Sequence, residues 1–330
     1  MNLSLDDFDA FHLAVHGTHA FPWQVRLLRQ VVDNRAWPRV LDLPTGTGKT
    51  TCIDIALFAL ALDVADPTHR WCPRRIAMVV DRRVVVDQVA ERGRKLLATL
   101  IAADASPVVC EVAARLRALS READEPVGVF TLRGGMPKDD GWARTPDQPL
   151  IIASTVDQVG SRLLVQGYGV STGMRPVHAG LLANDVLLLL DEVHLSQPFA
   201  ETLDQLDRLR KRFAAGSPLV PRFHHAFLSA TPGTSDGQVF RLADDEKTLA
   251  SPIGPRLHAP KPVRLVEKQD RAALEQHCVD EASRLTERHD VVAVVVNRVA
   301  SAAAIARRLR EALSDRADVA LLTGRMRPLD

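Results

Sequence analysis

Long hydrophobic runs and a large net charge are both absent from this sequence of 330 residues. Its apolar runs, such as residues 56–62 and 186–190, fall far short of the roughly 18 residues that a membrane-spanning helix needs. The 42 basic and 41 acidic side chains leave a formal charge of +1, which excludes a histone-like polycation. Residues 1–11 are acidic where a signal or transit peptide would be basic. We therefore expect a cytoplasmic protein with no membrane partner.

Cysteines and aromatic residues are few. The four cysteines form no CxxC pair and no spacing typical of metal ligands, so we expect neither a disulfide framework nor a zinc site. Aromatic residues make up 5% of the chain, which argues against an extensive platform for stacking nucleic-acid bases. By contrast, 46% of the residues are hydrophobic and 25% are charged, a balance that buries a core and excludes disorder.

Short apolar runs alternate with longer helical patterns over most of the chain. This alternation is typical of βαβ units, and strands nearly continuous in Val, Ile and Leu are typical of parallel sheets covered on both faces. The sequence therefore predicts an α/β fold with a parallel sheet and flanking helices. The predicted strands are residues 40–43, 76–80, 127–131, 150–153, 186–190 and 226–229, and the clearest helices are residues 50–62, 84–102 and 200–213.

Residues 250–262 have the composition of a linker, with four prolines and one glycine. At about 150 residues per domain the length suggests two domains, so we predict a first domain at residues 1–249 and a second at residues 263–330. The second has a fresh α/β pattern, with strands predicted at residues 263–266, 291–296 and 319–322. Because an α/β domain usually needs about 100 residues or more, we expect this domain to be incomplete.

The strongest single signal is PTGTGKT at residues 44–50, between a predicted strand and an apolar helix. In such a P-loop, glycines let backbone N–H groups surround a phosphate at a helix N-terminus. Lys49 is then expected to reach the β- and γ-phosphates, and the Thr50 hydroxyl to bind Mg²⁺. Leu43 stands where the longer form of the motif has its first glycine. The alternative is a glycine-rich turn with a solvated lysine.

Two adjacent carboxylates, Asp191 and Glu192, follow the apolar run at residues 186–190. At the carboxyl end of a central strand they would face the crevice in which α/β sheets bind ligands. Asp191 is suited to hold Mg²⁺ through water, and Glu192 to orient and polarise the water that attacks a phosphate. The alternative is an acidic cap in solvent at the end of a strand.

The P-loop, the DEVH sequence at residues 191–194 and the SAT sequence at residues 229–231 occur in the order found in superfamily 2 helicases of the DExH type, which the chain resembles. The short T-G-x-G-K-T form of the P-loop occurs in that superfamily. The resemblance sharpens to the helicase–nuclease of type I CRISPR interference, particularly subtype I-U, also called I-G. The segments that carry it are FPWQ (21–24), LPTGTGKTT (43–51), MVVDRRVVVDQ (78–88), LRGGM (132–136), ASTVDQVGSRLL (153–164), LLLLDEVHLSQPF (187–199) and FLSATPG (227–233).

The resemblance implies a RecA-like lobe that binds ATP and Mg²⁺, followed by the start of a second RecA-like lobe. The nucleotide-binding residues that it implies are Gln24, Thr45, Gly46, Thr47, Gly48, Lys49, Thr50 and Thr51. Lys49, Asp191 and Glu192 would be catalytic, and Thr50 and Asp191 would hold Mg²⁺. His194, Ser229 and Thr231 would couple the nucleotide state to movement along a strand.

Gln24 matches the glutamine that selects adenine, because a side-chain amide can pair with two adenine nitrogens. A polar residue that begins a surface helix is the alternative for this position. The lone histidine and the SAT sequence could likewise serve only as local caps and turns. Their order and spacing favour the functional interpretation.

Residues 70–95 contain eight basic residues against three acidic ones, which we interpret as a concentrated patch that attracts phosphate backbones. The resemblance assigns contacts with single-stranded nucleic acid to Arg82, Arg83, Gly134, Gly135 and Thr155. Such backbone contacts are independent of sequence and suit a motor that moves along any strand. The alternative is an ordinary solvated helix face.

The sequence thus indicates the N-terminal part of an ATP-dependent translocase or helicase of CRISPR antiviral defence. Its implied partners are single-stranded DNA and an RNA-guided type I surveillance complex. We expect these residues to bind ATP weakly and hydrolyse it poorly, because a second-lobe arginine and the nuclease domain would follow residue 330. Another DExH motor that acts on RNA or duplex DNA, and a nucleic-acid-binding fragment without ATP turnover, are the alternatives.

Overall fold

The computed structural model describes residues 2–64, 70–134, 140–214, 222–229, 238–314 and 316–323. The chain divides into two compact units, Met1–Ala259 and Pro260–Asp330. This division falls inside the proline-rich segment at residues 250–262. None of the helices in the described ranges is long and apolar enough to cross a membrane.

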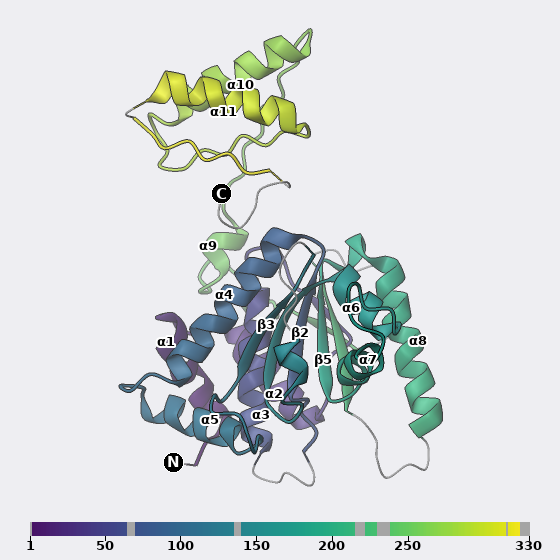
Figure 1. The fold of residues 1–330 in the computed structure, drawn as a ribbon. Coiled ribbons are helices and arrows are strands. Elements are labelled where there is room, and N and C mark those ends of the chain that lie inside the picture. The colour runs from purple at the N-terminus through teal and green to yellow at the C-terminus, as the bar shows by residue number, and fades with distance from the viewer. Residues whose placement is uncertain are drawn as a thin grey trace. The chain divides into compact units, whose positions relative to one another are not determined.

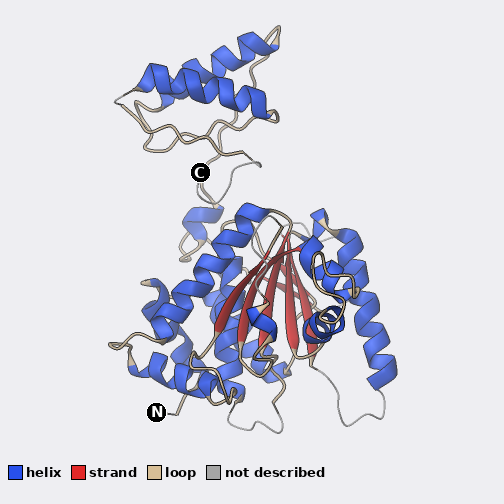
Figure 2. Ribbon diagram, viewed as in Figure 1, coloured by secondary structure: helices blue, strands red, loops and turns tan. Residues whose placement is uncertain are grey.

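A seven-stranded parallel sheet forms the centre of the first unit, and its strand order is β3-β4-β2-β5-β6-β1-β7. Figures 1 and 2 show the sheet with helices packed around it. The predicted α/β class with a parallel sheet and flanking helices is confirmed. All six strands predicted in residues 1–249 formed. Five lie within two residues of their expected bounds, β6 begins three residues earlier than expected, and β7 was not predicted. The strands are β1 (Val40–Asp42), β2 (Arg75–Val80), β3 (Gly128–Leu132), β4 (Leu150–Thr155), β5 (Val186–Asp191), β6 (Phe223–Ser229) and β7 (Val239–Arg241).

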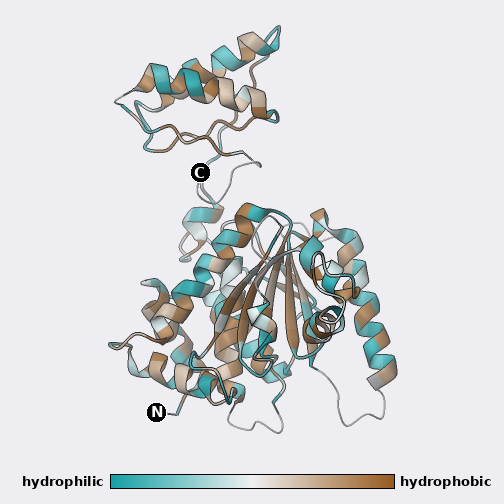
Figure 3. Cartoon of the chain, in the orientation of Figure 1, coloured by the Kyte–Doolittle hydropathy of each residue, from teal (hydrophilic) through white to brown (hydrophobic). Residues whose placement is uncertain are grey.

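Helices cover both faces of this sheet, because alternate residues of each strand pack to opposite sides. In β5, Leu187 and Leu189 join one hydrophobic core, whereas Leu188 and Leu190 join the other. Figure 3 shows the strands as a continuous hydrophobic layer. The first core is covered by α1 (Phe8–His16), α2 (Pro22–Asn34), α3 (Cys52–Asp63), α4 (Arg83–Leu100) and α5 (Pro107–Arg117). The second is covered by α6 (Val156–Leu163), α7 (Arg175–Ala183) and α8 (Gln197–Ala214).

The helix that follows the P-loop, α3, is buried on every side. Residues 52–61 are all buried, and a helix that is apolar all round belongs in the core of an α/β domain. The P-loop is therefore anchored to the most protected helix of the unit. Short helices complete the first unit: η1 (Leu5–Asp7), η2 (Lys49–Thr51), η3 (Gly141–Ala143), η4 (Val193–Leu195), η5 (Asp245–Lys247) and α9 (Gly254–Leu257).

The second unit contains two helices in its described part, α10 (Arg271–Leu285) and α11 (Val299–Leu313), which pack through a small core that includes Val279, Ile305 and Leu309. The strands predicted at residues 263–266, 291–296 and 319–322 were wrong, since these described segments form no strand. A strand exists only where a neighbour completes its hydrogen-bond ladder, and none of the three segments pairs with another.

Candidate nucleotide site

Three neighbouring strands bring the predicted site residues to one edge of the sheet. β6 lies between β5 and β1 and pairs with both in parallel, so the carboxyl ends of all three strands lie side by side. The P-loop follows β1, the DEVH sequence begins at Asp191, the last residue of β5, and Ser229 ends β6. The Leu43 amide donates to the Ser229 carbonyl at 3.0 Å, which joins the start of the P-loop to the end of β6.

The P-loop turns through two glycines in the left-handed region, Gly46 at φ +81° and Gly48 at φ +83°. Residues with a side chain rarely adopt this conformation, so glycine is required at both positions. Two side-chain hydrogen bonds stabilise the loop. Thr47 Oγ1 donates to the Pro44 carbonyl at 2.8 Å, and Trp23 Nε1 donates to the Thr47 carbonyl at 3.1 Å. Trp23 was not predicted as a site residue.

Lys49 meets the DEVH sequence directly. Its Nζ donates to Glu192 Oε1 at 3.2 Å, across 143 residues of sequence. The Lys49 side chain is 10% exposed and that of Glu192 is 30% exposed, so the pair is partly buried. Glu192 adopts φ +48°, a strained backbone conformation that is typical of functional sites. On the other side, His194 Nδ1 lies 3.4 Å from Glu192 Oε2.

Asp191 supplies the test of whether the site fits a divalent cation. Its Oδ1 is buried and has no hydrogen-bond partner among the residues that the structure describes. Burial raises the pKa of Asp191; the charge of Lys49 opposes this rise and that of Glu192 adds to it. An unsatisfied carboxylate oxygen beside a P-loop fits Mg²⁺, which usually takes one or two protein oxygens together with substrate phosphates and waters. Within the described ranges, no group of three or more His, Cys, Asp or Glu side chains could hold a metal ion by itself. A cation at this site would therefore need oxygens from the substrate and from water as well.

Gln24 lies against the P-loop at the start of α2. Its side chain is almost fully buried, its Oε1 accepts from the Phe21 amide at 2.8 Å, and its Nε2 would lie 3.2 Å from a Cβ added to Gly48. Arg256 of α9 reaches the same place. It donates to the Gly46 carbonyl at 3.2 Å, and its guanidinium lies 5.4 Å from the centre of the Phe21 ring. Part of the segment predicted as a linker therefore packs on the P-loop, and its composition did not indicate this contact.

The residues predicted to contact nucleic acid follow three other neighbouring strands, β3, β4 and β2. Arg82 and Arg83 are exposed just after β2, Thr155 ends β4, and Gly134 follows β3. A Cβ at Gly134 would lie 3.2 Å from Arg83 Nη2, so this glycine and the arginine are close neighbours. Gly135 and Thr231 lie outside the described residues.

The basic patch predicted at residues 70–95 was wrong as a single surface. Arg75 begins β2 and Arg82 follows its end, so the two lie at opposite edges of the sheet. Arg75 is buried and donates to three backbone carbonyls, while Arg70 forms a two-pronged pair with Asp185. These arginines satisfy internal acceptors and are not available to a phosphate backbone. Counting charges along the sequence could not distinguish these arginines from Arg82, because residues close in sequence can lie at opposite ends of the same strand.

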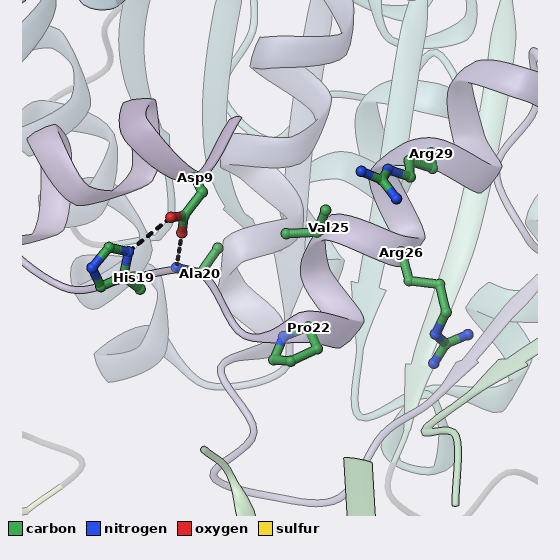
Figure 4. Close-up of a pocket in the computed structure, with 7 residues that line it drawn as sticks. All are labelled: Asp9, His19, Ala20, Pro22, Val25, Arg26 and Arg29. Carbon is green, nitrogen blue, oxygen red and sulfur yellow. Dashed lines mark hydrogen bonds and ion pairs between the residues drawn. The ribbon is translucent and has the colours of Figure 1, made fainter. Parts of the chain in front are cut away.

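A cavity of about 490 Å³ lies against α2 (Figure 4). Its charged side chains already have partners, since His19 binds Asp9, Arg26 binds Glu246 and Arg29 binds Asp6. The cavity therefore offers no unpaired charge to a phosphate, and we assign it no role in the nucleotide site. Its lining residues are Asp9, His19, Ala20, Pro22, Val25, Arg26 and Arg29.

The chain is similar to several solved structures at low identity. It is 15% identical to the DEAD-box helicase Mss116 bound to ssRNA and UDP-BeF, over 71% of this chain and 42% of that one, with a TM-score of 0.42. It is 15% identical to the helicase domain of Pyrococcus furiosus Hef, over 89% and 53%, with a TM-score of 0.39. It is 12% identical to the yeast DEAD-box splicing factor Prp28, over 94% of this chain and 63% of that one, with a TM-score of 0.42.

The chain spans about half the length of these solved structures, between 42% and 63%. No family model and no curated protein sequence matches it. Identities and scores this low carry no residue's role from one chain to another. A function must therefore be argued from the residues of the site.

Proposed function

We propose that this protein is an ATP-dependent nucleic-acid motor of the DExH helicase type. The observation that carries the proposal is the contact between Lys49 and Glu192 at 3.2 Å, which joins a P-loop to a carboxylate pair at the ends of nearby parallel strands. A phosphate-binding turn opposite two acids is the arrangement that phosphoryl transfer to water requires. An acidic cap in solvent would not receive the P-loop lysine.

In the proposed reaction, the P-loop amides and Lys49 bind the triphosphate. Lys49 leaves Glu192 for the phosphates, because a triphosphate carries more negative charge than one carboxylate. Glu192 is then free to accept a proton from the attacking water and to orient it. Thr50 and Asp191 would hold Mg²⁺, which neutralises charge on the phosphates when it is bound.

The neighbours of these groups support a role in coupling. His194 contacts Glu192, and the Ser229 carbonyl accepts a hydrogen bond from Leu43, the residue before the P-loop. We propose that these two residues, with Thr231, transmit the presence of the γ-phosphate to the nucleic-acid site. Gln24 and Thr45–Thr51 are proposed to bind the nucleotide.

Single-stranded DNA is the proposed track, held by Arg82, Arg83, Gly134, Gly135 and Thr155. The four that lie within the described residues stand at or just after the carboxyl ends of the neighbouring strands β3, β4 and β2. Contacts with the nucleic-acid backbone need no base recognition. The assignment to type I CRISPR interference, with recruitment by an RNA-guided surveillance complex, rests on the sequence resemblance. Residues 263–330 are proposed to begin a second RecA-like lobe.

The test of the proposed function is ATP hydrolysis measured alone, with single-stranded DNA and with single-stranded RNA. We expect single-stranded DNA to raise the turnover more than RNA does, because translocation on DNA is the proposed activity. Greater stimulation by RNA would identify an RNA motor instead. A chain that binds nucleic acid yet shows no nucleotide binding would contradict the proposal.

Replacing Arg83 by glutamine is expected to weaken binding of single-stranded DNA severalfold and to reduce the salt dependence of binding by about one counterion. The reason is that one exposed cation beside Gly134 is lost while the helix is retained. Binding measured by fluorescence anisotropy at several salt concentrations checks both effects. Arg121, which is exposed before β3 at the opposite edge of the sheet, provides the matched control; an equal loss in Arg121→Gln would show that only overall charge matters.

A further inference from the structure

A buried cluster of charged side chains lies beneath the P-loop. Asp54 of α3 is fully buried, and its two oxygens accept from different helices: Oδ1 from His16 Nε2 at 2.5 Å and Oδ2 from Arg92 Nε at 2.7 Å. Arg92 also donates through Nη2 to Thr51 Oγ1 at 2.9 Å. The cluster therefore ties α1, α3 and α4 to the last residue of the phosphate-binding segment.

This cluster is more than a means of filling space. α3 is otherwise apolar where it is buried, and replacing a buried ion pair with hydrophobic residues is often neutral or stabilising. Burial opposes ionisation of Asp54, but hydrogen bonds and charge from His16 and Arg92 outweigh it and hold the pKa of this carboxyl below its ordinary value. A charged group kept in this position points to a directional role, because its partners must lie at fixed places.

The start and the middle of α4 lie at the two proposed ligand sites. The helix begins at Arg83, which is proposed to hold the nucleic-acid backbone, and Arg92 lies nine residues further along, about 14 Å at the helical rise. Thr51 follows directly after Thr50, which is proposed to hold Mg²⁺. An α-helix moves as a stiff body, so a displacement at Arg83 reaches Arg92 and, through its guanidinium, Thr51.

We propose that Arg92 is a positioning residue that couples nucleic-acid binding at the start of α4 to nucleotide binding at the P-loop, through Thr51 and Asp54. The inference rests on the proposed function, since it requires both ligand sites. His16 and Asp54 hold the guanidinium at the angle from which it reaches Thr51. His16 is itself held by the ring of His12, whose centre lies 4.7 Å away.

The decisive variant is Arg92→Lys, because a lysine ammonium keeps the charge but cannot serve two acceptors with the fork of a guanidinium. The affinity for a fluorescent ATP analogue is measured with and without oligothymidylate, and the ratio is the coupling factor. We expect a factor of roughly five or more in the original chain and a value near one in the variant. Binding of each ligand alone is expected to change less than about twofold.

Arg115→Lys is the matched control. Arg115 also donates to α3, at the Ala61 carbonyl, and pairs with Glu111, but it lies at the end of α3 away from the P-loop. Its replacement removes a similar fork, and we expect the coupling factor to be unchanged. Thermal unfolding of both variants separates a loss of stability from a loss of coupling.

Two further variants keep the proposal testable if Arg92→Lys does not fold. Thr51→Ser retains the hydroxyl acceptor and should retain the coupling, whereas Thr51→Val removes the acceptor and should lose it. Unchanged coupling in Arg92→Lys or Thr51→Val, or an equal loss in Arg115→Lys, would overturn the proposal. An original chain that binds both ligands without coupling, or binds neither, would overturn it as well. Coupled binding without hydrolysis would leave the coupling intact and contradict only the proposed activity.

Discussion

Replacing Lys49 by alanine is expected to lower ATP turnover at least about a hundredfold and to weaken ATP binding at least about tenfold. The lysine is the P-loop cation that approaches the carboxylate pair, and its removal takes charge-assisted hydrogen bonds from both the bound triphosphate and the transition state. Turnover with single-stranded DNA and titration with a fluorescent ATP analogue measure the two effects.

The fold is expected to survive this replacement. Neither Lys49 nor Glu192 belongs to the hydrophobic cores that hold the sheet and its helices together, so the midpoint of thermal unfolding should change little. Lys211→Ala is the control, because Lys211 forms an ion pair with Asp207 within α8, and its side chain is 76% exposed. Hydrolysis that persists in Lys49→Ala would remove the basis of the site assignment.

Replacing Glu192 by glutamine is expected to abolish turnover, at least about a hundredfold, while ATP binding is kept. Glutamine preserves the size of the side chain but cannot accept a proton from the attacking water. It also releases Lys49 from its ion pair, so ATP binding should be equal or slightly tighter. The same binding and turnover assays distinguish this pattern from that of Lys49→Ala, in which binding itself is lost.

Glu201 offers a matched control for this variant, since it is an exposed glutamate on α8. Glu201→Gln should leave both ATP binding and turnover unchanged. If Glu192→Gln retained turnover, Glu192 would not be the group that activates water, and the acidic pair would serve only as a cap at the end of β5. If Glu192→Gln lost ATP binding as severely as Lys49→Ala, Glu192 would be needed to bind ATP, and the separate roles proposed for the two residues would be wrong.

Much of the fold could be predicted because its signals are local. The Val, Ile and Leu runs that became β2, β4 and β5 are buried on both faces, and this burial is what their composition indicates. The same reasoning failed at residues 291–296, which have a similar composition but no pairing neighbour. It also missed β7, whose three residues are too short to show a pattern.

The candidate site likewise contains residues that could be predicted from the sequence and residues that could not. Gly46 and Gly48 could be predicted because a left-handed turn restricts the residue type at that position alone. Arg256 could not, since nothing in a proline-rich segment indicates contact with a carbonyl 210 residues earlier. In the sequence, the arginines at positions 70, 75 and 92 contribute the same charge as Arg82. In the structure, all three donate hydrogen bonds to acceptors within the protein.

The sequence by itself determined the α/β class, the phosphate-binding turn after β1 and the two carboxylates at the end of β5. These depend on backbone angles and on burial periodicity, which act over a few residues. Tertiary structure alone decided that β6 separates β1 from β5, that Lys49 meets Glu192 and that Arg92 reaches Thr51. Strand order and the partner of a charged side chain are set by the packing of distant segments, and no local preference specifies them.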